Sequence, residues 1–158
     1  MDAALVLSAM LALPGHRLDA AELPEVRAAR LRPHAEGIAL AALTVEHAAA
    51  LVAQAHHETR WAAYVLDGRC HEGPVGERCD NGLSRGAFQV RAWCRATTPA
   101  GEAACALSQF RYGWARCGSV AGGYVALAGV RGCEWSGAAE RVRTFRRVAA
   151  VLRAGGSK

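Results

Sequence analysis

The chain has 158 residues, which is enough for one compact domain and too few for two. Hydrophobic residues make up 52% of it but aromatic residues only 6%, because alanine is abundant, and alanine favours helices. The net charge of +5 favours an anionic partner, but no signature of a nucleic-acid-binding module accompanies it, and no apolar run approaches the roughly 20 residues that span a bilayer. We therefore expect a single, mostly α-helical domain over residues 1–158, with no membrane span and no nucleic-acid partner.

The N-terminal third is expected to begin with two short helices. The first spans residues 3–13 and ends at Pro14, and the second spans residues 19–32 and is broken by Pro24. Asp2 stands where an export signal carries a basic residue, and no clear cleavage site follows, so we interpret the first segment as a helix of the domain. An atypical export signal is the alternative.

The main helix is expected to follow Pro33 and to run from His34 to His57. Its apolar residues mark two faces: Ile38, Ala41, Val45, Ala48, Val52 and Ala55 on one, and Leu40, Leu43 and Leu51 on another. A helix that is apolar nearly all round is normally buried in the middle of a bundle. Its carboxyl end, where Glu58 lies, should therefore emerge from the core into whatever cleft the fold has.

The chain becomes irregular after this helix. Residues 62–83 are rich in glycine, and residues 86–91 are the only convincing strand candidate. Because side chains alternate along a strand, Gln89 should lie on the face opposite Phe88 and Val90, which face the core.

Three further helices are predicted in the last third. Thr98 and Pro99 form a good N-cap and first-turn pair for a helix to about residue 115. Ser119 can cap a helix to about residue 130, and Ser136 can cap one to about residue 153.

Six cysteines lie in the second half of the chain, and an even number in a small domain indicates a disulfide framework. We expect neighbours to pair, as Cys70–Cys79, Cys94–Cys105 and Cys117–Cys133. Free thiols or bound zinc are the alternatives, but the Cys-x2-4-Cys knuckles of zinc sites do not occur. Disulfides place a protein outside the reducing cytoplasm, and we expect a periplasmic or extracellular location.

Two short segments carry the chemistry. One is Glu58-Thr59-Arg60, and the other is residues 84–90, Ser-Arg-Gly-Ala-Phe-Gln-Val. A carboxyl group packed against apolar surface is favoured in its neutral form, and the negative end of a helix dipole acts in the same direction. Such an acid can donate a proton to a leaving-group oxygen, and its conjugate base can take a proton back. The alternative for Glu58 is a solvated glutamate paired with Arg60.

The second segment supplies groups that suit a sugar. The amide of Gln89 both donates and accepts hydrogen bonds, as needed to hold a hydroxyl or N-acetyl group. Gly86 lets the backbone approach a ligand closely, and Ser84 can bond to the substrate or to the acid. A solvent-facing glutamine and a turn serine are the plainer alternatives.

Together with residues 123–129, Gly-Tyr-Val-Ala-Leu-Ala-Gly, these segments resemble the lysozyme-like superfamily, in particular soluble lytic transglycosylases and goose-type lysozymes. In that family a Glu followed by Ser or Thr ends the central helix, and a Ser-x-x-Gly-(Leu/Ala)-(Met/Phe)-Gln-(Ile/Val) segment follows. An element with Ala-Tyr and glycines lies further on. The resemblance covers roughly residues 35–147. The spacing of the second segment differs slightly, and Val125 replaces the Asn that often follows the tyrosine.

The resemblance implies a lysozyme-like helical domain with a buried central helix and a small β region. It also implies cleavage of the β-1,4 bond between N-acetylmuramic acid and N-acetylglucosamine in peptidoglycan. Glu58 would be the general acid and then the base, while Gln89, Tyr124 and Ser84 would bind substrate. No cofactor is expected, and the protein is expected to be a monomer, exported by a bacterium or carried in a phage virion.

Asp80 bears on the mechanism, because goose-type lysozymes carry an aspartate at the corresponding place. Those enzymes usually have a second aspartate after the Gln-Val pair, where this chain has Arg91. An inverting hydrolase needs a second carboxylate about 6.5–9.5 Å from the acid to activate water, and Asp80 could be that base. A lytic transglycosylase needs none, because the 6-hydroxyl of the muramyl residue attacks and leaves a 1,6-anhydro product. The alternative is a loop residue, since Asp-Asn-Gly is typical of turns.

A metal site is not expected, because the His-Glu-x-x-His pattern that begins at His57 fails at Trp61. Tryptophans could supply a stacking face for sugars: Trp61, Trp93, Trp114 and Trp135. The arginines of the last helix could hold an anionic wall polymer or form a solvated face: Arg141, Arg143, Arg146, Arg147 and Arg153. Two other classes stay open, namely a non-catalytic glycan-binding or wall-anchoring module and a disulfide-stabilised structural or inhibitory domain without a glycan site.

Overall fold

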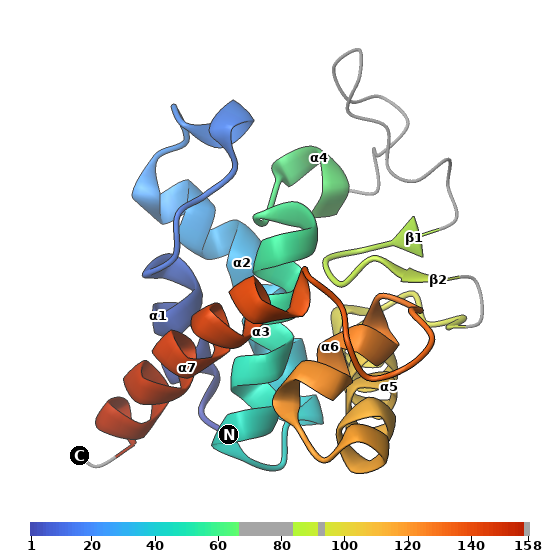
Figure 1. Cartoon of the computed structure of the whole chain (residues 1–158). Coiled ribbons are helices and arrows are strands. Elements are labelled where there is room, and N and C mark those ends of the chain that lie inside the picture. The colour runs from blue at the N-terminus through green and yellow to red at the C-terminus, as the bar shows by residue number, and fades with distance from the viewer. Residues whose placement is uncertain (67–83, 92–93, 157–158) are drawn as a thin grey trace.

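A computed structural model of the chain describes residues 1–66, 84–91 and 94–156 (Figure 1). Most of these residues are helical, which confirms the predicted mostly α fold. The α-helices are α1 (Ala3–Leu11), α2 (Pro24–Ala41), α3 (Val45–Thr59), α4 (Ala63–Leu66), α5 (Pro99–Cys117), α6 (Val120–Leu127) and α7 (Ala138–Gly155). A short 3-10 helix, η1 (Arg17–Asp19), and two strands, β1 (Ser84–Arg85) and β2 (Val90–Arg91), complete the elements.

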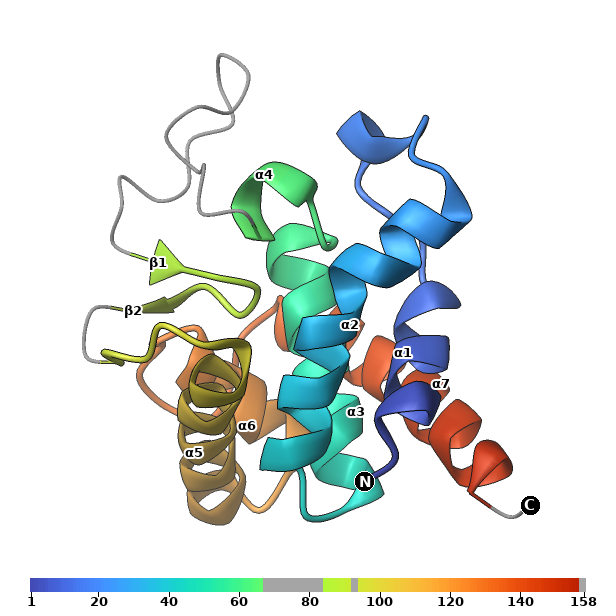
Figure 2. The ribbon, with the colours of Figure 1, turned by 180° about the vertical axis from the view of Figure 1, so that it is seen from behind.

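Helix α3 lies between α7, which crosses in front of it in Figure 1, and α2, which is seen in front of it in Figure 2. Its residues from Ala48 to His56 are all buried, and Leu51 and Val52 belong to the central hydrophobic core. Alanine dominates this stretch, so neighbouring helices can approach closely. The expected buried helix is therefore present, and its carboxyl end, like its amino end, reaches the surface.

The expected single helix from His34 to His57 is wrong, because the chain turns between α2 and α3. Pro33 lies inside α2 instead of opening a helix. The break comes at Thr44, whose side chain accepts a hydrogen bond from the N–H of His47 at 3.2 Å and so caps α3. Leu40 and Leu43, assigned to a buried face, lie at this corner and are each 77% exposed.

The expected strand over residues 86–91 is also wrong in detail. Residues 86–89 form a turn that joins β1 to β2, with Ser84 paired to Arg91 in an antiparallel register. Gly86 and Gln89 both have positive φ values, 64° and 48°, so the chain reverses where an extended strand was predicted. Phe88 is buried, as expected. In both views the turn lies against the upper end of α3 (Figures 1 and 2).

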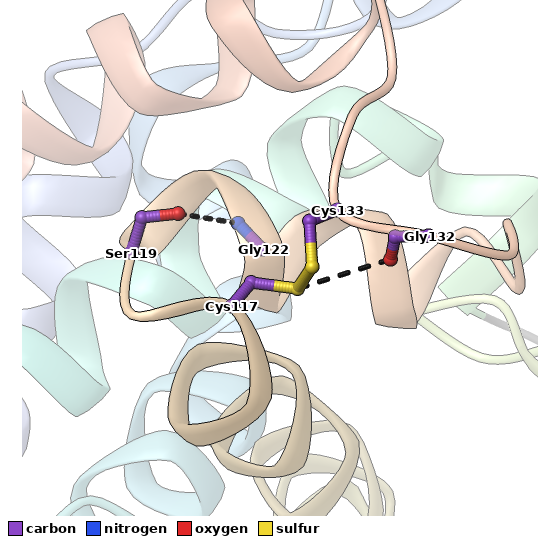
Figure 3. The surroundings of a disulfide bond; sticks show 5 residues. All are labelled: Cys117, Ser119, Gly122, Gly132 and Cys133. Atoms are coloured by element: carbon purple, nitrogen blue, oxygen red, sulfur yellow. Dashed lines mark hydrogen bonds between the residues drawn. A yellow bond between two sulfur atoms is a disulfide. The ribbon is translucent and has the colours of Figure 1, made fainter.

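Two of the three predicted N-caps are confirmed. Thr98 caps α5 by accepting from the N–H of Gly101 at 3.2 Å, and Ser119 caps α6 by accepting from Gly122 at 3.1 Å (Figure 3). Helix α7 begins after Gly137 without a side-chain cap, so Ser136 does not have the predicted role.

Two disulfides form as predicted, Cys94–Cys105 and Cys117–Cys133. The second joins the end of α5 to the segment before α7 and so encloses α6 (Figure 3). The predicted pair Cys70–Cys79 lies outside the described residues. Within the described ranges, the helices are all too short or too polar to cross a membrane.

Candidate functional site

Glu58 is the second-last residue of α3, at the point where this buried helix reaches the surface. Its side chain is 26% exposed. The helix ends because Arg60 and Trp61 adopt positive φ values of 46° and 61°, which turn the chain away from the helix axis. The carboxyl group is therefore left at the rim of the core, as predicted.

One carboxyl oxygen of Glu58 is held by two donors. Gln54, one helical turn earlier, donates from Nε2 to Oε1 at 2.9 Å, and Arg141 donates from Nη2 to the same Oε1 at 2.7 Å. Arg141 Nε also lies 3.3 Å from Gln54 Oε1, so the three side chains form a closed cluster. Within the described part of the chain, Oε2 of Glu58 makes no hydrogen bond.

Arg141 reaches this cluster from the first turn of α7, and its guanidinium also stacks over Trp135 at 4.6 Å from the ring centroid. The predicted alternative partner, Arg60, does not make this contact. Gln54 could have been found from its i, i+4 spacing to Glu58. Arg141 could not be singled out among the arginines of the last helix, because its partner is 83 residues away in sequence.

The turn that joins β1 to β2 packs against the end of α3 through Thr59. The hydroxyl of Thr59 lies 3.0 Å from the carbonyl oxygen of Ala55 and 3.5 Å from that of Ala87, and it accepts from the N–H of Trp61 at 3.1 Å. The structure therefore brings together the two segments that the sequence singled out, Glu58-Thr59 and the turn of residues 86–89.

A second carboxyl group, which the sequence analysis missed, supports this turn from α5. Glu102 accepts a hydrogen bond from the N–H of Ala87, and a Cβ atom added to Gly86 would overlap its carboxyl group. Burial raises the pKa of Glu102, and the bond from Ala87 opposes that shift. No local pattern marks Glu102, because its contacts are with a segment that is distant in sequence.

Gln89 bonds within its own turn, since its Nε2 donates to the carbonyl oxygen of Gly86 at 2.9 Å. Its side chain is half-buried, and its backbone has the positive φ noted above. One of its two amide donors is therefore used to close the turn. The side chain of Ser84 and all of Asp80 lie outside the described part of the structure.

Tyr124 is fully buried and is not brought to Glu58. Its hydroxyl donates to the carbonyl oxygen of Ala50 at 3.3 Å, and Ala50 lies two helical turns before Glu58. Its ring packs edge-on against that of Phe110, with the two ring centroids 5.1 Å apart. Burial raises the pKa of this tyrosine. In this arrangement Tyr124 cannot touch a ligand; it supports the middle of α3.

The two histidines before Glu58 lie in different surroundings. His57 shares a hydrogen bond of 2.8 Å between Nε2 and Thr144 Oγ1 of α7, and burial, followed by the charge of Arg141, lowers its pKa. His56 is buried, and burial lowers its pKa to about 4, so it is neutral near pH 7. The described residues hold no group of three or more side chains suited to a metal ion.

Comparison of the chain with protein-family models, with curated proteins and with solved structures finds no match.

Proposed function

We propose that the protein is a peptidoglycan-cleaving glycosidase with a lysozyme-like fold, and that Glu58 is its proton donor. One observation carries this proposal. Glu58 lies at the end of a buried helix, and the next residue, Thr59, contacts the carbonyl oxygen of Ala87 in a glycine-opened turn. Cleavage of a β-1,4 glycosidic bond needs an acid that can reach the glycosidic oxygen, and Glu58 is the partly exposed carboxyl group at this place.

The hydrogen bonds of Glu58 are compatible with this role. Gln54 and Arg141 both donate to Oε1, which fixes the plane of the carboxyl group, and Oε2, to which none of the described residues bonds, would carry the proton. In the first step Oε2 protonates the glycosidic oxygen, and the bond to the muramyl C1 breaks. In the second step the same oxygen takes a proton from the attacking hydroxyl group, which belongs either to water or to the muramyl residue itself.

The structural elements around Glu58 would then have separate tasks. Gln89 would contact the glycan through the amide groups that its bond to Gly86 leaves unused. Tyr124 would keep α3 in place through Ala50. The choice between hydrolysis and anhydro-product formation depends on a second carboxylate, for which Asp80 is the candidate. The two disulfides favour a working place outside the reducing cytoplasm.

The ion pair between Glu58 and Arg141 favours a second candidate, a glycan-binding module that has this fold but no turnover. Arg141 donates to Oε1 of Glu58 at 2.7 Å, and paired charged side chains of this kind form strong hydrogen bonds with the hydroxyl groups of sugars. In that case Glu58 and Arg141 would hold sugar hydroxyl groups together.

The test is digestion of purified peptidoglycan by wild type and by Glu58→Gln, with products identified by mass spectrometry. Glu36→Gln, at an exposed position of α2, is the matched control. Products made by wild type and Glu36→Gln but not by Glu58→Gln would support the enzyme. Anhydro products would indicate a transglycosylase, and reducing ends a hydrolase. Binding by all three proteins without products would favour the module, and the absence of both would rule out both candidates.

A further inference from the structure

The helix that carries Glu58 ends on an arginine in a backbone conformation that usually belongs to glycine. Arg60 caps the carboxyl end of α3 with φ 46° and ψ 29°, and its N–H donates to the carbonyl oxygen of His56 at 2.9 Å. Helix α5 ends in the same way, but its cap is Gly118, with φ 66° and ψ 15°. A side chain in this left-handed region crowds its own backbone, so glycine is the usual residue at such a helix end. The chain therefore carries a strain at Arg60 that it avoids at Gly118.

The backbone around Arg60 is fixed by its neighbours and not by its own side chain. The N–H of Trp61 donates to Thr59 Oγ1 at 3.1 Å, the carbonyl oxygen of Trp61 accepts from Arg30, and the indole ring is fully buried. Arg60 itself is exposed, and no carboxyl group in the described part of the chain pairs with it. A strained residue that is held in place by its surroundings is typical of functional sites.

The structural alternative for Arg60 is the helix dipole, which favours a cation at the carboxyl end of a helix. That end of α3 already holds a cation, because the guanidinium of Arg141 bonds to Glu58. Burial is the main cause that lowers the pKa of His56 and of His57, and the charge of Arg60 contributes to both shifts. Arg60 therefore adds a positive charge to a place that already has one, and an anion from outside the chain would balance it.

We propose that Arg60 is a substrate-binding residue that selects glycans carrying a carboxylate over neutral glycans. A guanidinium pairs with a carboxylate through two parallel hydrogen bonds, and none of the described carboxyl groups uses Arg60 in this way. Arg60 follows Glu58 by two residues at the same end of α3, so the carboxylate would be bound near the acid. Arg60 would take no part in proton transfer.

The choice of a glycan as the ligand rests on the proposed function. Peptidoglycan offers two sources of the carboxylate, the lactyl group of N-acetylmuramic acid and the peptide attached to it, whereas chitin has neither. Arg60 would therefore be the residue that separates these two β-1,4-linked polymers.

The test is an NMR titration of the ¹⁵N-labelled full chain with three sugars. The first, N-acetylglucosamine β-1,4-linked to N-acetylmuramic acid, has a free lactyl carboxylate. The second is the same disaccharide with a tetrapeptide on its lactyl group, and the third is neutral diacetylchitobiose. None contains the bond that the proposed enzyme cuts, so binding is measured without turnover. The amide signals of residues 59–61 report binding. Arg60→Gln and Arg60→Gly remove the guanidinium, and Arg111→Gln, exposed on α5, is the matched control for the lost charge.

We expect wild type and Arg111→Gln to bind one or both of the charged sugars at least about tenfold more tightly than diacetylchitobiose. The sugar that is preferred identifies the source of the carboxylate. Both Arg60 variants should lose this preference. Arg60→Gly should also melt about 2–4 °C higher than wild type, because glycine adopts the left-handed conformation without strain.

Equal binding of the three sugars by wild type, or binding of none, would overturn the inference, and so would a preference that persists in Arg60→Gly. A melting temperature that does not rise in Arg60→Gly would also count against it, because the arginine would then serve the end of the helix. The outcome is distinguishable from that of the proposed function. Digestion products without a preference for charged sugars contradict only the role of Arg60, and a preference that depends on Arg60 without digestion products contradicts only the enzyme.

Discussion

Arg141 is the residue that, from another helix, holds the carboxyl group of Glu58 in place. It donates to Glu58 and Gln54, and it stacks on Trp135, so it joins α7 to the carboxyl end of α3. A glutamate at a helix end could be expected from the sequence, and so could its position at the rim of the core. The ion pair of Glu58 with Arg141 could not be expected from the sequence. The helix that carries Arg141 has several other arginines, and nothing in the local sequence distinguishes Arg141 from them.

Arg141→Met should therefore have effects that Arg143→Met, at the exposed neighbouring position, does not have. Loss of the guanidinium should lower the free energy of unfolding by about 1 kcal/mol, since the pair is partly exposed. If Glu58 is the proton donor, the rate of glycan digestion should also fall, because Oε1 is no longer held in place. Urea denaturation and the digestion assay measure the two effects. A digestion rate that is unchanged or higher would show that Arg141 does not orient Glu58.

Gly86→Ala tests the contact between the turn and Glu102. Gly86 has a φ of 64° and its added Cβ would overlap the Glu102 carboxyl group, whereas Gly118 has a φ of 66° and open space around it. Both substitutions carry the strain of a left-handed alanine, about 1 kcal/mol. We expect Gly86→Ala to lower the free energy of unfolding by about 1 kcal/mol more than Gly118→Ala, the cost of the overlap. Equal losses would mean that Glu102 moves aside freely.

At the scale of the elements, the sequence predicted which parts of the chain are helical better than it predicted where each helix begins and ends. The caps at Thr98 and Ser119 were found because a side-chain acceptor and its N–H donor are three residues apart. The break at Thr44 was missed because apolar residues continue through Leu43, and periodicity does not reveal that a chain turns there. The turn at residues 86–89 was taken for a strand because Phe-Gln-Val is typical of strands, and the backbone of Gln89 depends on tertiary contacts.

Ser119→Ala and Ser136→Ala should differ, because only the first removes a helix cap. Loss of the bond to Gly122 should lower the free energy of unfolding by about 1 kcal/mol. Ser136→Ala should change it by less than about 0.5 kcal/mol, as is usual for an exposed position. Thermal and chemical unfolding of the two variants measure this directly. A comparable loss in both would contradict the assignment of the cap.

At the scale of the whole molecule, the helices bury two neutral histidines, His34 in α2 and His56 in α3. Burial is the main cause that lowers the pKa of each to about 4, from 6.5. Protons therefore bind the unfolded chain before they bind the folded one. The folded state is therefore at its most stable, as far as these two histidines are concerned, above pH 6.5, where they are neutral in both states. That stability is lost as the pH falls from 6.5 toward 4, because protons then bind the unfolded chain.

We therefore expect the free energy of unfolding to fall on acidification from pH 7.5 to pH 4, by roughly 2–3 kcal/mol for each histidine at most. His56→Met cannot titrate, so this variant should lose less stability than wild type over the same range, whatever its stability at pH 7.5. Denaturant unfolding at several pH values measures both slopes. Identical slopes in the two proteins would contradict the prediction for His56.

The link between Cys117 and Cys133 also changes what a cut in the backbone would do. The residues from Val130 to Glu134 are exposed, and the bridge joins the chain on both sides of most of them. A protease that cleaves after Arg131 would thus open the polypeptide without separating its halves. Such nicked protein would migrate as one band without reductant and as two bands with it, and α7, with Arg141 on it, would stay tethered to the rest of the molecule.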